Sequence, residues 1–320
     1  MRFTPFLKCL SLLGLAAIFV PANAQDSLED LRAADLQIAQ IGEALSVRNA
    51  AMCDPSGWRT GLVLHDIRQY DFPDSVKPVF GFESDISVEA VVPGSPADQA
   101  GIKPNMGIEA IDGVIADKVR PSKDSDQPAS NARMDAVLDL IDQKSVDGAL
   151  VLDTVLNGEH KQITVHPAAG CPARFQISLK AVVAEAYNGG KYITISRELL
   201  NYADTVDELA LIMAHELAHR ILHHTDRLKR RGKSNVEMMI LGPLSKTAGR
   251  VRFTEVEADR LALYVMANAG YDPSIAPDFW DRFQAKFGMG VFGDGSHPGR
   301  EKRVEYAKRS EEHTSELQSH

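Results

Sequence analysis

The stretch TVDELALIMAHELAHRILHH, residues 205–224, decides how this chain folds around its chemistry. Its apolar residues recur at three- and four-residue spacings, the pattern of one face of an α-helix. Thr205 followed three positions later by Glu208 forms a capping box, which predicts where the helix begins. We expect the helix to continue to about Arg231, because basic residues suit the negative end of its dipole and Gly232 follows.

Three residues inside this helix carry the pattern H-E-x-x-H: His215, Glu216 and His219. Residues four apart lie one turn above each other, so both imidazoles can bind a single cation. Neutral imidazole is a good ligand for zinc, and a glutamate beside the first histidine can take a proton from a zinc-activated water. The spacing therefore predicts a catalytic centre with one Zn²⁺ per chain and Glu216 as general base, rather than a helix with two incidental histidines.

A catalytic zinc site needs a third protein ligand, which the pattern itself does not supply. His223 continues the four-residue series, but three ligands along one straight helix diverge from a tetrahedral centre, so we expect His223 and His224 to be exposed. Glu255 and Asp259 lie four apart on a second predicted helix, which Thr254 can cap. Taken alone, such a pair of carboxylates describes a solvated helix face equally well.

The first 24 residues have the features of a secretory signal peptide. A basic start precedes an apolar run from Leu10 to Val20, and small residues follow it. This run is too short to remain as a membrane-spanning helix. We therefore expect cleavage between Ala24 and Gln25, no stable transmembrane anchor, and secretion across the inner membrane to the periplasm.

The last residues, RSEEHTSELQSH at 309–320, match the translation of a common sequencing-library adapter. We therefore expect native sequence to stop near Lys308; the alternative is a polar disordered tail. Residues 25–308 are long enough for two domains, and 44% hydrophobic with 25% charged residues is typical of a globular chain. The net charge of −9 disfavours nucleic acid as a partner.

Two cysteines, Cys53 and Cys171, remain after removal of the signal peptide. An exported chain enters a compartment that oxidises thiols, so a disulfide between them is expected. The alternative is two separately buried thiols. A disulfide would tie the end of the first helical segment, residues 25–60, to the start of the second domain.

Residues 61–170 contain short β-prone runs separated by glycine, proline and aspartate, which predicts a β-rich unit. Within it, VVPGSPADQAGIKPNMGIEAIDG at 91–113 resembles the core of a PDZ domain. Ser95 can cap a short helix, and the Asp-Gly pair at 112–113 indicates a hairpin. The resemblance implies that a peptide terminus binds at a sheet edge, with residues 79–82 as the carboxylate loop. Alternatively, the unit only packs against its neighbour.

The second domain, residues 175–308, resembles the HtpX and CAAX-prenyl-protease family of gluzincins, metallopeptidase family forty-eight. The hallmark of that family is H-E-x-x-H followed by E-x-x-A-D on a second helix, which Glu255 to Asp259 match. The resemblance implies that Glu255 is the third zinc ligand and that Asp259 orients a ligand imidazole. Residues 186–200 resemble the active-site edge strand of the family. We assign its substrate-pairing part to Lys191, Tyr192, Ile193, Thr194 and Ile195.

A late segment, HPGREKRV at 297–304, resembles the histidine-proline motif of the same family. The resemblance implies that His297 reaches the active site, where it either stabilises the oxyanion or blocks the metal, with Arg303 beside it. The alternative for His297 is a loop histidine before a helix started by Pro298.

These observations predict an α+β fold: a mainly α-helical, zincin-type metallopeptidase domain with a small edge-strand sheet, preceded by a β-rich PDZ-like domain. The resemblance implies a zinc metalloendopeptidase acting on exported or misfolded proteins, with the PDZ-like domain recognising substrates. A second hypothesis is a peptide-binding or chaperone protein whose metal centre is latent. The intact Glu216 favours the enzyme, because a binding module needs no general base.

Overall fold

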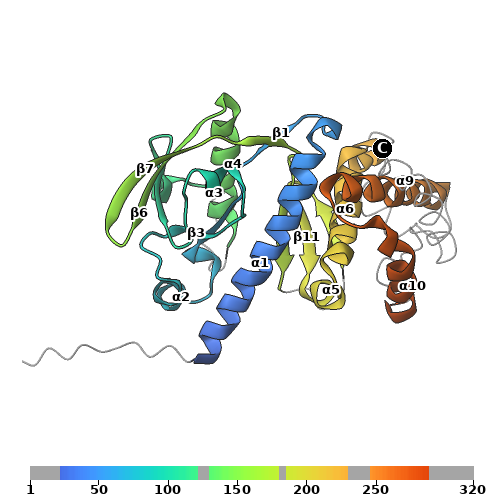
Figure 1. Ribbon diagram of the computed structural model, residues 1–320, viewed down its shortest axis with the longest axis horizontal. Coiled ribbons are helices and arrows are strands. Elements are labelled where there is room, and N and C mark those ends of the chain that lie inside the picture. Colours follow the sequence, from blue (N-terminus) through green and yellow to red (C-terminus); the bar gives the residue numbers. More distant parts are fainter. Residues whose placement is uncertain (1–21, 122–129, 180–184, 230–245, 288–320) are drawn as a thin grey trace, which may run out of the picture.

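The computed structural model describes residues 22–121, 130–179, 185–229 and 246–287. A β-rich unit and a mainly helical unit lie on either side of the long helix α1 (Ala22–Arg48) (Figure 1). This mixture of helices and mostly antiparallel strands confirms the predicted α+β class. Of the described helices, none is both long and apolar enough to cross a membrane. The adapter-like tail and residues 1–21 of the predicted signal peptide lie outside the described residues, whereas its last three residues, 22–24, begin α1.

The β-rich unit is one six-stranded sheet with neighbouring strands in the order β2, β3, β4, β6, β7, and β5 pairs with β4. All of its pairings are antiparallel. Its strands are β2 (Leu62–Asp66), β3 (Ile86–Val91), β4 (Gly107–Ile111), β5 (Val114–Ile115), β6 (Leu150–Leu156) and β7 (Glu159–Val165). Its helices are α2 (Pro73–Phe80), α3 (Pro96–Gln99) and α4 (Ala132–Lys144).

Two local predictions for this unit are confirmed. The Ser95 side chain caps α3 by accepting a hydrogen bond from the backbone N–H of Asp98. The pair at 112–113 forms the turn between β4 and β5, with positive φ at both positions. Residues 79–82, by contrast, pack inward: Phe80 and Phe82 are buried with ring centroids 5.0 Å apart. The aromatic side chains of that segment therefore contribute to a small core.

The helical unit contains a three-stranded sheet in the order β10, β11, β9. Its strands are β9 (Arg174–Ser178), β10 (Ala186–Gly189) and β11 (Tyr192–Ser196). Its helices are α5 (Arg197–Tyr202), α6 (Val206–Ile221), α7 (His224–Lys229), α9 (Lys246–Ala269) and α10 (Ala276–Phe287). Strand β11 pairs antiparallel with β10 and parallel with β9, so it occupies the middle of the sheet.

This topology corrects the predicted substrate strand. The residues assigned to it were Lys191, Tyr192, Ile193, Thr194 and Ile195, of which Lys191 lies in the turn before β11 and the others form the central strand. Both edges of a central strand are already hydrogen-bonded, so β11 cannot pair with an added peptide. The outer strands of this sheet are β10 and β9.

Two helix boundaries also differ from the predictions. Helix α6 begins after the predicted cap, with the Thr205 hydroxyl accepting from the backbone N–H of Glu208, but it ends at Ile221 instead of near residue 231. His223 then adopts a positive φ of 51°, and the chain turns into α7. Helix α9 begins at Lys246, so Thr254 lies inside the helix and not at the predicted N-terminal position.

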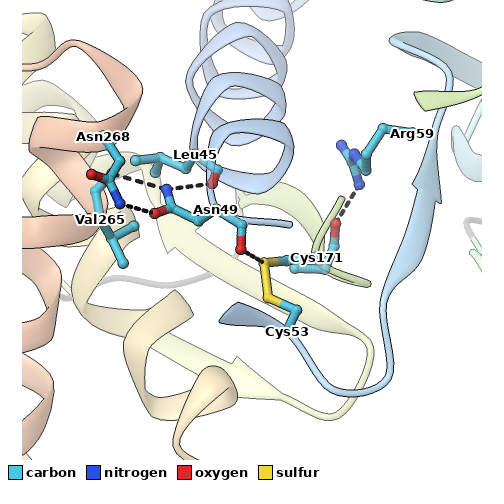
Figure 2. The surroundings of a disulfide bond; sticks show 8 residues. Leu45, Asn49, Cys53, Arg59, Cys171, Val265 and Asn268 are labelled. Atoms are coloured by element: carbon cyan, nitrogen blue, oxygen red, sulfur yellow. Dashed lines mark hydrogen bonds between the residues drawn. A yellow bond between two sulfur atoms is a disulfide. The ribbon is translucent and has the colours of Figure 1, made fainter. Parts of the chain in front are cut away.

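Helix α1 belongs to the core of the helical unit. Its buried Ile38, Ile41 and Leu45 share one hydrophobic cluster with residues of α6, α9 and α10. At its end, the Asn49 side chain donates hydrogen bonds to the backbone oxygens of Leu45 and Val265, at 2.9 and 3.0 Å (Figure 2). The helical unit therefore includes a segment that precedes the whole β-rich unit in the sequence.

The chain enters and leaves the β-rich unit at one neck. Strand β1 (Gly57–Arg59), which enters the unit, pairs antiparallel with β8 (Ala168–Gly170), which leaves it. Directly beside this pair, Cys53 and Cys171 form a disulfide between positions 118 residues apart (Figure 2). The neck thus holds together both ends of an inserted unit.

Candidate metal centre

Two packed helices bring the predicted site residues together. Helix α6 carries His215, Glu216 and His219, and α9 carries Glu255 and Asp259. Four of these side chains are buried, with exposures from 2% to 8%, and His219 is half-buried. Buried histidines and carboxylates need compensating charge, so this cluster is costly unless a proton or a cation is shared among its members.

The spacing of the ligand atoms fits one metal ion. Nε2 of His215 lies 3.1 Å from Nε2 of His219, and Oε2 of Glu255 lies 3.3 and 3.4 Å from these two nitrogens. Four-coordinate zinc with bonds of about 2.0–2.1 Å requires separations of about 3.3–3.4 Å between its ligand atoms. Two imidazole nitrogens and one carboxylate oxygen therefore form a nearly equilateral triangle of the size that zinc requires.

The electrostatics of the cluster also favour a cation. Burial lowers the pKa of His215, but the carboxylates of Asp259 and Glu255 outweigh burial and raise this pKa to about 10. A site that holds a proton so firmly is one in which positive charge is stabilised. The same two carboxylates would stabilise a divalent ion, so the residues fit the metal that the sequence predicts.

Asp259 contacts the first ligand imidazole from behind. Its Oδ1 lies 3.0 Å from Nδ1 of His215, while Nε2 of the same ring points to Glu255. A carboxylate on the far nitrogen fixes both the tautomer and the orientation of a metal-binding histidine. The position of Asp259 is the one that this role requires.

The second imidazole has a partner that the sequence reasoning missed. His224, expected to be exposed, is only 2% exposed, and its Nδ1 lies 2.9 Å from Nδ1 of His219. Its Nε2 lies 3.3 Å from Oε2 of Glu257, and Arg227 donates to the same oxygen at 3.1 Å. The early end of α6 turns His224 inward, which no periodic pattern in the sequence signals.

The hydrogen-bond roles in this chain follow from the charge of His224. Burial, followed by the neighbouring His219, lowers the pKa of His224 to about 3, so its ring is neutral. For Nε2 of His219 to bind a metal ion, the proton of this ring must lie on Nδ1, and Nδ1 of the neutral His224 then accepts it. That tautomer leaves the lone pair of Nε2 on His219 directed at Glu255 and His215, where a metal ion would take it.

A pocket of about 550 Å³ lies beside the cluster. It is lined by His219 and Arg220 of α6, by Asn188 of the outer strand β10, and by the segment after α1 that contains Cys53. Nη1 of Arg220 donates to the backbone oxygen of Gly190 at 2.5 Å, which fastens the β10–β11 turn to the metal helix. The outer strand β10 and this pocket therefore lie next to the candidate metal ligand His219. His297 and Arg303 lie outside the described residues.

A helix-borne H-E-x-x-H pattern completed by a glutamate from a second helix defines the metallopeptidase class of site. The sequence comparisons agree, since residues 165–249 match the profile of Peptidase family M48. This part of the chain therefore resembles M48 metallopeptidases. The matched residues include His215, Glu216 and His219 but stop before Glu255. The position of Glu255 in the cluster comes from the structure and not from this match.

Known relatives resemble the chain over about a third of its length. The beta-barrel assembly-enhancing protease of Escherichia coli O157:H7 is 26% identical over 140 residues, covering 35% of this chain and 28% of that protein. The mitochondrial metalloendopeptidase OMA1 of Arabidopsis thaliana is 28% identical over 126 residues, covering 35% of this chain and 26% of that protein. OMA1 of Schizosaccharomyces pombe is 26% identical over 134 residues and is covered to 40%. The matched region thus spans between 26% and 40% of each of these relatives.

Proposed function

We propose that this chain is a zinc-dependent endopeptidase that hydrolyses peptide bonds in exported or misfolded proteins. One observation carries the proposal: two imidazoles and a carboxylate from two helices form a triangle of zinc-ligand size around the H-E-x-x-H pattern. The signal-peptide features and the disulfide support a periplasmic site of action.

In this proposal His215, His219 and Glu255 hold the metal. Zn²⁺ bound there supplies Lewis acidity, both for the attacking water and for the scissile carbonyl. Glu216 accepts the proton of the attacking water and delivers it to the leaving amine. Asp259 and His224 keep the two ligand imidazoles in the required tautomers.

The substrate would bind along β10 (Ala186–Gly189). Within the described sheet this strand pairs only with β11, so its other edge can accept an extended peptide through main-chain hydrogen bonds. The 550 Å³ pocket at the end of β10 would receive a neighbouring substrate side chain. This arrangement assigns to β10 the pairing role that the sequence analysis gave to the next strand.

The β-rich unit would recognise substrates before cleavage. The PDZ-like segment supports this role, since its capped helix and its hairpin turn have the geometry that the resemblance predicts. Protein or peptide substrates are therefore the proposed partners, and the recognised feature would be an exposed strand or chain terminus.

The decisive experiment compares the zinc-loaded wild type with Glu216→Gln on a urea-unfolded outer-membrane protein after dilution. We expect the wild type to cleave it and the variant to be slower by a factor of about 10²–10⁴, because only the general base is lost. Zinc content, measured by metal analysis, should stay at one ion per chain in both. If neither protein cleaves while both still bind the unfolded chain, the proposal is wrong and a binding protein is favoured.

A further inference from the structure

The pocket beside the candidate metal centre contains a cation without a carboxylate partner among the described residues. Arg220 follows the candidate ligand His219 directly in α6, lines this pocket and is partly buried. Its Nη1 donates to two neutral oxygens, the backbone oxygen of Gly190 at 2.5 Å and Oδ1 of Asn188 at 3.4 Å. The other buried or partly buried arginines whose side chains the structure describes each pair with a carboxylate: Arg32, Arg59, Arg133, Arg174 and Arg227. The charge of Arg220 is therefore left for a ligand to neutralise.

The bonds at Nη1 orient the guanidinium of Arg220 and leave one of its edges uncommitted. Nε–H and one N–H of Nη2 point the same way along this edge, and neither atom is hydrogen-bonded to a described residue. An edge with two parallel N–H groups binds both oxygens of a carboxylate at once. Because Gly190 and Asn188 already hold the group in place, a carboxylate would bind there without the entropic cost of ordering a long side chain.

Two carboxylates, those of Asp54 and Asp226, also line the pocket and oppose the binding of an anion. Both residues are exposed, whereas Arg220, Asn188 and His219 are partly buried. Water and salt screen exposed charges strongly and a partly buried charge less. The guanidinium therefore contributes more than either carboxylate to the charge that a side chain meets inside the pocket.

We propose that Arg220 binds a carboxylate of the substrate in this pocket. The proposal rests on the zinc-peptidase function above and adds a substrate class to it. Because His219 is both a candidate metal ligand and a wall of the pocket, the carboxylate belongs to a residue close to the cleaved bond. It comes from an aspartate or glutamate side chain or from the C-terminus of the chain, which a guanidinium recognises in the same way. Arg220 thus determines specificity and takes no part in the chemical step.

Binding can be measured without cleavage in the zinc-loaded Glu216→Gln protein. The probe is an eight-residue peptide with one central glutamate, capped at both ends and carrying an uncharged fluorescent label. Matched probes have glutamine or lysine at the central position. We expect the glutamate probe to bind about tenfold more tightly than the glutamine probe. If the lysine probe binds most tightly, Asp54 and Asp226 select the side chain and the proposal is wrong.

A second substitution in the same background connects the preference to Arg220. Arg220→Gln keeps an N–H donor for Gly190 but removes the charge, so the glutamate and glutamine probes should bind within about twofold of each other. Lys191→Gln removes a neighbouring cation that does not line the pocket and is paired with Asp139, so the preference should persist. A preference that survives in Arg220→Gln would mean that the carboxylate binds elsewhere, such as at the metal ion, and would contradict the proposal. The comparison of probes in the parent protein needs no variant of the pocket.

Two short probes identify the source of the carboxylate. Each ends at the residue that is central in the long probe, here glutamine, one with a free C-terminal carboxylate and the other with an amide. Tighter binding of the free carboxylate, lost in Arg220→Gln, supports a chain terminus as the ligand, whereas a preference confined to the glutamate side chain supports acidic residues. Absence of both preferences overturns the proposal even if the wild type cleaves unfolded proteins. If a preference is found and the wild type cleaves nothing, only the proposed peptidase function fails.

Discussion

Among the described residues, two clusters combine histidine with carboxylates at distances that could hold a metal ion, and they differ in how their atoms are spaced. At the candidate metal centre three ligand atoms are almost equally separated, by 3.1–3.4 Å. In the β-rich unit, Nε2 of His65 lies 2.5 Å from Glu89 of β3 but 3.8 Å from Asp35 of α1. The first pattern leaves room for an ion at its centre, whereas the second closes directly on one carboxylate.

The charges of the second cluster agree with an ion pair that shares a proton. Burial lowers the pKa of His65, but Asp35 and Glu89 outweigh it and raise this pKa to about 9. The hydroxyl of Tyr70 contacts the other nitrogen of the ring. Burial also raises the pKa of Glu89, although His65 opposes that shift. The comparison teaches that residue types alone do not define a metal site; equal separations among the ligand atoms do.

The largest expected difference concerns zinc itself. Glu255→Gln should lower zinc affinity by a factor of at least about 100, because it removes the charged ligand of the triangle. The matched variant Glu89→Gln should keep one zinc per chain, since Glu89 and His65 hold a proton between them and no zinc. Metal analysis after dialysis against a graded chelator measures both. A wild type with two zinc ions, or loss of zinc in Glu89→Gln, would break the comparison.

A smaller effect is expected at His224, which touches a ligand rather than the metal. His224→Phe should lower zinc affinity about 10–100-fold, because the Nδ1–H of His219 loses its acceptor. His224→Gln should restore most of the affinity, since its amide can accept from His219 and donate to Glu257. Chelator competition at equal protein stability measures the change. Equal affinities for the two variants would show that His224 only fills space.

The smallest effect is expected in the pH dependence of stability. The pKa of His65 is about 9 in the fold and about 6.5 in the unfolded chain, so its proton stabilises the fold fully below pH 6.5 and is lost by pH 9. The free energy of unfolding should fall by about 1–3 kcal/mol across that window. The charged groups that raise the pKa of His65 are Asp35 and Glu89, and the hydroxyl of Tyr70 lies against its ring.

His65→Gln removes the titrating group and should flatten this slope. Urea unfolding at pH 6.5, 7.5 and 9, with zinc present for both proteins, gives the difference between wild type and variant. Because groups elsewhere contribute equally to both, the difference isolates His65. A variant with the same slope as the wild type would mean that the proton of His65 is not shared in the fold.

Local spacing was sufficient to predict the centre of the site. The capping residue Thr205 and the four-residue interval between His215 and His219 depend only on helix geometry, and the structure has both. The interval between α6 and α9 has no such periodicity. Glu255 was therefore assigned from family resemblance, and only the packing of the two helices brings it within 3.4 Å of both imidazoles.

Three features could not be predicted because they depend on contacts distant in sequence. Strand β11 becomes central through its parallel pairing with β9, which no local pattern encodes. His224 turns inward because α6 ends at Ile221, although helical residues continue in the sequence. Helix α1 joins the core of the helical unit although more than a hundred residues separate it from that unit.

The neck formed by β1, β8 and the Cys53–Cys171 disulfide marks the β-rich unit as an insertion in the sequence of the helical unit. Helix α1 must therefore emerge from the ribosome, or from a translocation channel, long before the strands and helices that cover its apolar face. During that interval the residues that cover Ile38, Ile41 and Leu45 have not yet been made, while the inserted β-rich unit already has the residues of its own core. A chain whose synthesis stalls within the β-rich unit would therefore leave the apolar face of α1 exposed.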